Sequence, residues 1–306
     1  MMLSFFIIFN CFLLLLLSTV YAFIDRKIQA RAQHRVGIKH AGIYGYQHVL
    51  AWGLKSLSKN AILDWKKAKW PQKIILLLII ISPFLFYTLL MMDAAYLRIE
   101  GAALWLCLTL LLFLLAENFF LFFDATNYSR LKIRQNQLTS LLGFSIFFLC
   151  MLVPITKLGS VELEIFNQRQ SHFPFLIALS SPAAFLSSII SFISLFFIFG
   201  LPPIGQLHEK HVGVNSIYLL LCAKRLWIVA TTSFVVFLYF GGDMWHFGGA
   251  LFYFLRLFLF LFLLILIGVV LPSLRSSSSL EILVKFLLPA VVCCLVFEIF
   301  WMGLLR

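Results

Sequence analysis

Eight long apolar runs decide what this chain of 306 residues can fold into. A run of about 20 apolar residues crosses roughly 30 Å of hydrocarbon as a helix. The chain is 62% hydrophobic with a mean hydropathy of +1.02, which excludes an ordinary soluble domain. The runs do not alternate every second residue, as membrane β-strands do. We therefore predict an all-α polytopic membrane protein, a single membrane domain over 1–306, with spans at about 3–24, 73–92, 101–123, 138–156, 173–201, 216–242, 250–271 and 282–304.

The first and fifth runs have sequence features that indicate whether the helix is retained and where it stops. No basic residue precedes the first run, and it is too long for the core of a signal peptide, so we expect a retained helix. The fifth run is long and contains Pro182, and it meets Leu201-Pro202-Pro203 at its end. Because proline interrupts a helix, we expect this span to bend at Pro182 or to stop before the proline pair.

The basic residues indicate the orientation. Sixteen Lys and Arg lie in the first, third, fifth and seventh loops, against three in the alternate loops. Positive loops stay in the cytoplasm, which predicts a multi-pass protein of a bacterial-type inner (cytoplasmic) membrane with both termini outside. The same bias, beside anionic lipids, explains the net charge of +12 better than nucleic-acid binding does, since no nucleic-acid module is visible.

The first loop, 25–72, is the most basic segment and follows the first span directly. Within it, apolar residues recur at helical spacing between 46 and 60, with Lys55 and Lys59 on the other flank. This pattern predicts a short amphipathic helix lying in the plane of the membrane surface. A membrane helix that leads into such a segment indicates a subunit that docks something at its cytoplasmic surface.

The sequence offers no self-contained catalytic or metal site. All six cysteines fall inside predicted spans, so neither a disulfide framework nor a metal or iron–sulfur site is indicated. His208 and His211 are three residues apart in a loop, whereas a zincin helix needs two histidines four apart. We expect no catalytic residue, no metal ligand and no redox centre in this chain.

Charged residues inside the spans are the remaining site candidates, because each costs roughly 3 kcal/mol or more in hydrocarbon unless it pairs or reaches the surface. Glu117 and Lys224 lie at similar depth on the cytoplasmic side, and we predict that they pair. Arg256 and Glu298 lie at similar depth near the outer side, and the same argument allows a second pair there. The alternative for each is a side chain that extends to the nearer surface, which we expect for Arg225.

Two segments carry a resemblance to a known family. The first runs without a gap from Asp25 to Asn60, and the second begins at Arg256 within the seventh span and continues to Pro289. Both resemble the mitochondrial complex I subunit 1 family, which includes the corresponding membrane subunit of bacterial NADH-quinone oxidoreductase. The matching residues are Arg26, Lys27, Gln33, Arg35, Gly37, Gly42, Gly45, Ala51, Lys55 and Lys59 in the first segment, and Arg256, Leu271-Pro272, Leu274-Arg275, Lys285 and Leu288-Pro289 in the second, with Phe240-Gly241-Gly242 and Trp245 at the end of the sixth span.

The departures from the family pattern concern acidic residues. The family is thought to couple quinone reduction to proton movement through a series of acidic side chains. Asp25 retains the negative charge at one of these family positions. The fourth span lacks the expected Glu near Gly143, and the sixth carries Lys224 where the family has Glu. The other positions that replace family acids are Trp52, Asn60, Ile193, Gly200, Pro203 and Gly205. Because these residues cannot titrate, the proton path is either rewired or lost.

The resemblance implies a divergent membrane subunit of a complex I-type NADH:quinone oxidoreductase, similar to complex I subunit 1. Its partners would be other membrane and peripheral subunits together with anionic lipids, and quinone would be its non-covalent ligand. Residues implied to face the quinone cavity or the docked arm are Asp25, Arg26, Arg31, Arg35, Lys55 and, on the third loop, Arg134. The alternative is a non-catalytic anchor or adaptor in an antiporter-like or hydrogenase-like ion-translocating complex. A freestanding transporter ranks third, because no repeated pair of broken helices is visible.

Overall fold

The computed structural model describes residues 2–34, 51, 70–93, 101–123, 127–170, 177–199, 214–241, 247–270 and 276–304. Across these residues the chain is helical, and eight helices are long and apolar enough to cross a membrane. The prediction of an all-α polytopic membrane protein with eight spans is therefore confirmed. Except for Ala51, the predicted in-plane helix at 46–60 lies outside the described residues.

The helices follow one another along the chain. In order they are α1 (Met2–Ala32), α4 (Trp70–Asp93), α5 (Ala102–Phe123), α6 (Asn127–Leu158), α7 (Leu163–Gln170), α8 (Ile177–Ser180), α9 (Pro182–Phe199), α10 (Val214–Phe240), α11 (Phe247–Val270), α12 (Ser276–Ile282), the π-helical turn Leu283–Leu287 and α13 (Leu288–Leu304). Leu288, which follows the π-helical turn, keeps right-handed helical angles. The last three elements therefore form one continuous eighth span.

Several span boundaries differ from the predicted ones. The first helix continues to Ala32, so the beginning of the basic segment is helical rather than a loop. The helix of the fourth span begins at Asn127, and its candidate span begins at Arg134 rather than 138, which places Arg134 on α6 instead of on the third loop. Polar residues prolong both helices because hydrophobicity marks where a helix meets the hydrocarbon and not where its hydrogen bonding ends.

The fifth predicted run divides at Pro182, where it was expected to bend. Pro182 is the first residue of α9, a position where its missing N–H leaves no hydrogen bond unmade. Ser181 precedes it, and its Oγ accepts a hydrogen bond from the Ala184 backbone N–H at 3.1 Å. Ser181 therefore caps α9, and α8 forms a separate turn before it.

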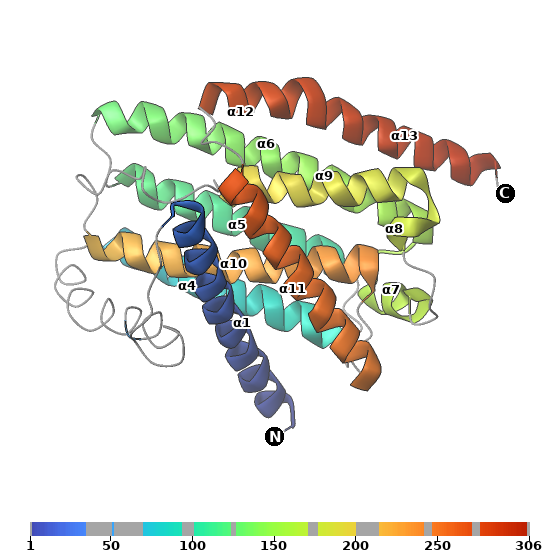
Figure 1. Cartoon of the computed structure of the whole chain (residues 1–306), viewed down its shortest axis with the longest axis horizontal. Helices are drawn as coiled ribbons and strands as arrows, with labels where there is room; N and C mark the ends of the chain where they lie inside the picture. The colour runs from blue at the N-terminus through green and yellow to red at the C-terminus, as the bar shows by residue number, and fades with distance from the viewer. Residues whose placement is uncertain are drawn as a thin grey trace.

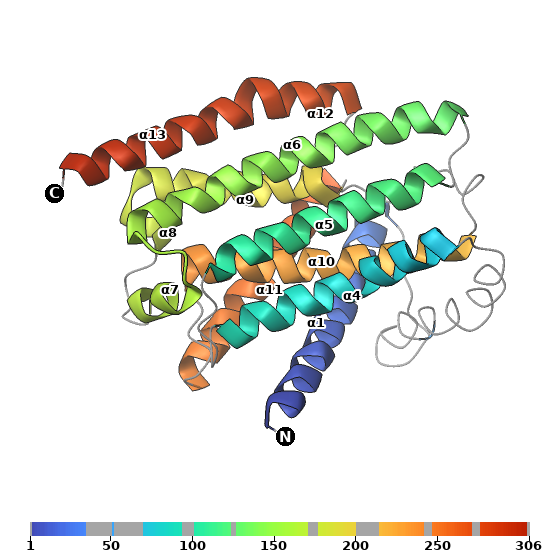
Figure 2. The ribbon, with the colours of Figure 1, turned by 180° about the vertical axis from the view of Figure 1, so that it is seen from behind.

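The helix α10 forms the centre of the bundle. It packs against α1, α4, α9 and α11, and 83% of its spanning segment is buried. In Figures 1 and 2 most helices run along the long axis of the molecule, whereas α1 and α11 lie obliquely across them. At the edge of the bundle opposite α1, the helix α13 packs on α6 and α9 (Figure 1). Only 28% of the α11 and α13 spans is buried within the chain, so most of their apolar surface faces outward.

Trp227 of α10 anchors this centre. Its ring lies 5.0 Å from that of Phe86 on α4 and 4.8 Å from that of Phe113 on α5, measured between centroids. The indole N–H donates a hydrogen bond to Ser82 Oγ at 3.2 Å, so the polar atom of this buried ring is paired. These contacts fix α4 and α5 against α10 and so place the charged residues that α5 and α10 carry.

Candidate functional site

Glu117 of α5 and Lys224 of α10 form a buried ion pair. Lys224 Nζ lies 2.5 Å from Glu117 Oε1, and the two side chains are 17% exposed for Lys224 and 8% for Glu117. The predicted approach of the third and sixth spans is confirmed by this contact. The pair lies at the end of the bundle where α1 ends and α4 begins, which we call the first-loop end. There each charge satisfies the other in a region that offers little water.

Asp25 and Arg225 extend this charged region between α1 and α10. Asp25 Oδ1 accepts a hydrogen bond from Gln29 Nε2, one turn further along α1, at 2.7 Å. Arg225 is half-buried and interacts electrostatically with both Asp25 and Arg26. Its intermediate exposure leaves the expectation that Arg225 extends to the surface as a prediction. We call Asp25, Arg26, Glu117, Lys224 and Arg225 the first-loop cluster.

The other predicted docking residues lie at the edge of this cluster or outside the description. Arg31 is exposed in the last turn of α1, and Arg134 is exposed near the start of α6. The end of α1 and the start of α6 both lie at the first-loop end. The structure therefore brings Asp25, Arg26, Arg31 and Arg134 to one end of the bundle. Arg35 and Lys55 lie outside the described residues.

Arg256 does not pair with Glu298, and that prediction is wrong. The Arg256 guanidinium Nη1 donates to the carbonyl of Phe240, the last residue of α10. Unpaired carbonyls at a helix C-terminus attract cations, and Gln170 Nε2 satisfies a second one, that of Leu238, at 2.8 Å. The helices explain the error: α11 packs on α1 and α10, whereas α13 packs on α6 and α9.

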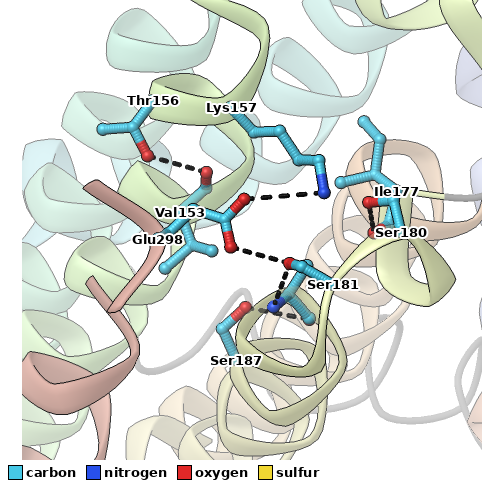
Figure 3. Close-up of polar contacts among 9 residues, drawn as sticks. Val153, Thr156, Lys157, Ile177, Ser180, Ser181, Ser187 and Glu298 are labelled. Carbon is cyan, nitrogen blue, oxygen red and sulfur yellow. Dashed lines mark hydrogen bonds and ion pairs between the residues drawn. The ribbon is translucent and has the colours of Figure 1, made fainter. Parts of the chain in front are cut away.

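Glu298 has partners that the sequence did not reveal. Its side chain is fully buried, and Oε2 accepts a hydrogen bond from Ser181 Oγ at 2.7 Å. Lys157 Nζ lies 3.5 Å from Oε1 (Figure 3). The predicted spans place Lys157 in an outer loop, but it occupies the last turn of α6. A serine directly before a proline is a recognisable helix N-cap and could have indicated Ser181.

An apolar groove lies between α4 and α5, away from both charged regions. It measures about 280 Å³ and is lined by Leu85, Leu89, Ala102, Trp105, Leu106 and Thr109. These residues occupy the end of α4 and the beginning of α5, whereas Glu117 lies near the end of α5. The groove is therefore at the opposite end of the bundle from the first-loop cluster.

Within the described residues, no group of three or more His, Cys, Asp or Glu side chains is placed to hold a metal ion. The cysteines among them are all free thiols. His208 and His211, whose spacing already argued against a zincin-type site, lie outside the described residues.

Comparison with known proteins identifies the family. A family model described as NADH dehydrogenase matches residues 3–299, nearly the whole chain. No match is found among curated protein sequences. The match agrees with the resemblance noted from the two end segments. The chain belongs to the NADH dehydrogenase family, that of complex I subunit 1 and its counterpart in bacterial NADH-quinone oxidoreductase, and is a complex I-type membrane subunit.

Proposed function

We propose that this chain is a divergent membrane component of an NADH:quinone oxidoreductase, which docks the peripheral arm and lines a quinone-like cavity at its first-loop end. The first-loop cluster is the observation that carries the proposal. It brings Asp25 and Arg26, both from the segment that resembles the family, within electrostatic range of Arg225 on α10. Partner subunits would bring the redox centres that oxidise NADH and reduce quinone, since this chain is proposed to contribute none.

The charge at this end supports docking of an acidic surface or of lipid phosphates. Three cations and two carboxylates make up the first-loop cluster, so it is positive as a whole. Arg31 and Arg134 add exposed positive charge on α1 and α6. Exposed cations favour association with acidic partners by long-range attraction. Both the arm and anionic lipid headgroups would be attracted to this end.

The same cations support the proposed orientation. The excess of Lys and Arg in the odd-numbered loops favours a cytoplasmic first-loop end, with both termini outside. The proposed location is a bacterial-type inner (cytoplasmic) membrane. A reporter at either terminus should then be reachable by an impermeant reagent in intact spheroplasts, and labelling only after lysis would contradict this orientation.

The loss of the usual proton-coupling carboxylates is part of the proposal, and three described positions support it. Lys224 is an ammonium paired with Glu117, and Ile193 is a partly buried apolar residue of α9. At Gly143 a Cβ atom would meet Phe197 Cβ at 3.1 Å and the Ile198 backbone N at 3.3 Å. A side chain at this crossing of α6 and α9 would therefore require neighbouring atoms to shift. A proton path would have to use other groups.

Affinity purification of the assembly tests the docking proposal. Solubilised membranes carrying tagged chain should yield both peripheral redox subunits and other membrane subunits, identified by mass spectrometry. The charge reversals Arg31→Glu and Arg134→Glu should reduce the recovery of peripheral subunits while membrane subunits stay. Lys285→Glu is the matched control, because Lys285 is also exposed but belongs to the eighth span.

The alternative function is a non-catalytic anchor in an antiporter-like or hydrogenase-like complex, and the Glu117–Lys224 pair favours it. Lys224 Nζ and Glu117 Oε1 lie 2.5 Å apart as a closed ion pair, which suits a structural contact between α5 and α10. Recovery of antiporter-like subunits without any quinone-chamber subunit would establish this alternative and overturn the first proposal.

A further inference from the structure

Glu298 is a buried carboxyl group at the end of the bundle opposite the first-loop cluster. It belongs to α13, whose other side chains around it, such as Phe297, Ile299 and Phe300, face outward. Glu298 alone in this turn is fully buried, because it points toward α6 and the break between α8 and α9 (Figure 3). An ionisable side chain within a span that faces the protein interior marks a functional site by default.

One oxygen of Glu298 is well satisfied. Oε2 accepts the hydroxyl proton of Ser181 at 2.7 Å, while Ser181 Oγ accepts the Ala184 backbone N–H at 3.1 Å. Because Ser181 also caps α9, its position is fixed by the helix and not only by the carboxyl group. Oε2 can therefore accept this hydrogen bond whether or not Oε1 carries a proton.

The second oxygen is not satisfied. Oε1 is buried and accepts no well-directed hydrogen bond, and Lys157 Nζ lies 3.5 Å from it. Oε1 is therefore the oxygen of this carboxyl group that can carry a proton without breaking a hydrogen bond. A proton placed on Oε1 would remove the buried charge and leave the Ser181 hydrogen bond in place.

Lys157 connects this oxygen to the surface. Its side chain is 18% exposed, and it lies at the end of α6, just before the exposed Gly159. If Glu298 becomes neutral, the ammonium can turn to water, so the loss of its partner does not strand a buried cation. Two states are therefore accessible, one with charged Glu298 facing Lys157 and one with neutral Glu298 and Lys157 in water. A pair of two fully buried ions would lack the second state.

The other titratable groups near Glu298 are thiols and a phenol. Cys294 lies one turn before it on α13 and interacts with it electrostatically. Cys150 of α6 interacts with Cys294 in turn, and Tyr239 of α10 donates to the Cys150 carbonyl at 2.6 Å and approaches Ser187 Oγ at 3.1 Å. None of these groups is a carboxylate or a second ammonium, so among the described residues Lys157 is the charged side chain that faces Glu298.

We infer that Glu298 is a proton-exchange site, at which Oε1 takes up a proton from the water at the end of α6 and returns it there, with Lys157 and Ser181 as positioning residues. In the charged state the carboxylate faces the Lys157 ammonium. In the neutral state the new O–H bond is on Oε1, Oε2 keeps the Ser181 hydrogen bond, and Lys157 turns outward. The exchange needs neither quinone nor the peripheral arm, so it stands or falls separately from the proposed function.

Infrared difference spectroscopy of the purified full-length chain in lipid nanodiscs tests this inference. The chain has 12 Asp and Glu, and its solvent-exposed acids share one carbonyl stretch when the pH is lowered. A carboxyl group protonated in an apolar site should add a separate carbonyl band, which shifts in D2O and disappears on return to high pH. The Glu298→Gln variant should lose this band, while Glu117→Gln should retain it. A wild-type protein without such a band, or a band unchanged in Glu298→Gln, would overturn the inference.

Variants of the two positioning residues give an independent readout that does not require Glu298→Gln to fold. Lys157→Met removes the facing cation and Ser181→Ala removes the hydrogen bond to the carboxylate, so both should strengthen the band at neutral pH. The control is Ser188→Ala, because Ser188 is buried on α9 but donates only to its own helix, at the Phe185 carbonyl. A band of the same strength in wild type, Lys157→Met and Ser181→Ala would show that Glu298 is not the responding group.

Discussion

Lys224 Nζ lies 2.5 Å from Glu117 Oε1, and both side chains are largely shielded from solvent. The contact joins α5 to α10 beside the Trp227 packing that already holds these helices together. The resemblance implies that Lys224 replaces a glutamate of the family pattern, which would reverse the charge at this position. Glu117 lies close enough to supply the compensating charge.

Breaking this pair should destabilise the protein more than removing it. Lys224→Met or Glu117→Gln alone leaves one buried charge without a partner, which we expect to cost about 3 kcal/mol. The double variant leaves no buried charge and should cost less than the sum of the two. Thermal unfolding of the detergent-purified protein measures all three. Additive losses would mean that the two charges act independently and that the pair contributes nothing.

Hydrophobic length predicted the eight spans, and depth along the span predicted the Glu117–Lys224 pair. Both follow from the membrane alone, since a helix must cross it and a buried charge needs a partner at similar depth. Depth says nothing about the direction in which a side chain points around its helix. Arg256 and Glu298 have similar depth, but they face different neighbours, the end of α10 and the break before α9. That arrangement depends on tertiary packing.

Proton transfer along the usual carboxylate file should be absent from the assembly. The resemblance implies that the positions which the family fills with acids hold here Lys224 and residues without a titratable side chain. Asp25, the acid that it implies is retained, accepts a hydrogen bond from Gln29. Purified complex in liposomes should therefore turn over without acidifying or alkalinising the lumen through this subunit. If turnover pumps protons, and neutralising Asp25 or Glu117 alone abolishes the pumping, the path has been rewired rather than lost.

Arg256 should contribute to stability through the end of α10. Arg256→Met removes the donor to the Phe240 carbonyl and leaves that group with one partner fewer, which we expect to cost about 1 to 3 kcal/mol. Gly241, with φ of +91°, ends the helix there, and Arg256 Nη1 lies 3.3 Å from where a Cβ atom on Gly241 would be. Arg134→Met, a change of the same kind at an exposed site, should leave the unfolding temperature unchanged. Equal effects of the two variants would contradict this role.

The crossing of α6 and α9 at Gly143 should reject even a methyl group. A Cβ there would lie 3.1 Å from Phe197 Cβ and 3.3 Å from the Ile198 backbone N, and a backbone atom of a packed helix moves aside less easily than the end of a flexible side chain. Gly143→Ala gains about 1 kcal/mol of helix propensity but should lose about 1 to 3 kcal/mol to overpacking. Gly268→Ala on α11 is the matched control, because its Cβ would meet only Phe196 at an ordinary 3.7 Å. It should be neutral or slightly stabilising. Thermal unfolding should thus place Gly143→Ala below wild type and Gly268→Ala at or above it, and the opposite order would mean that α6 and α9 do not pack this closely.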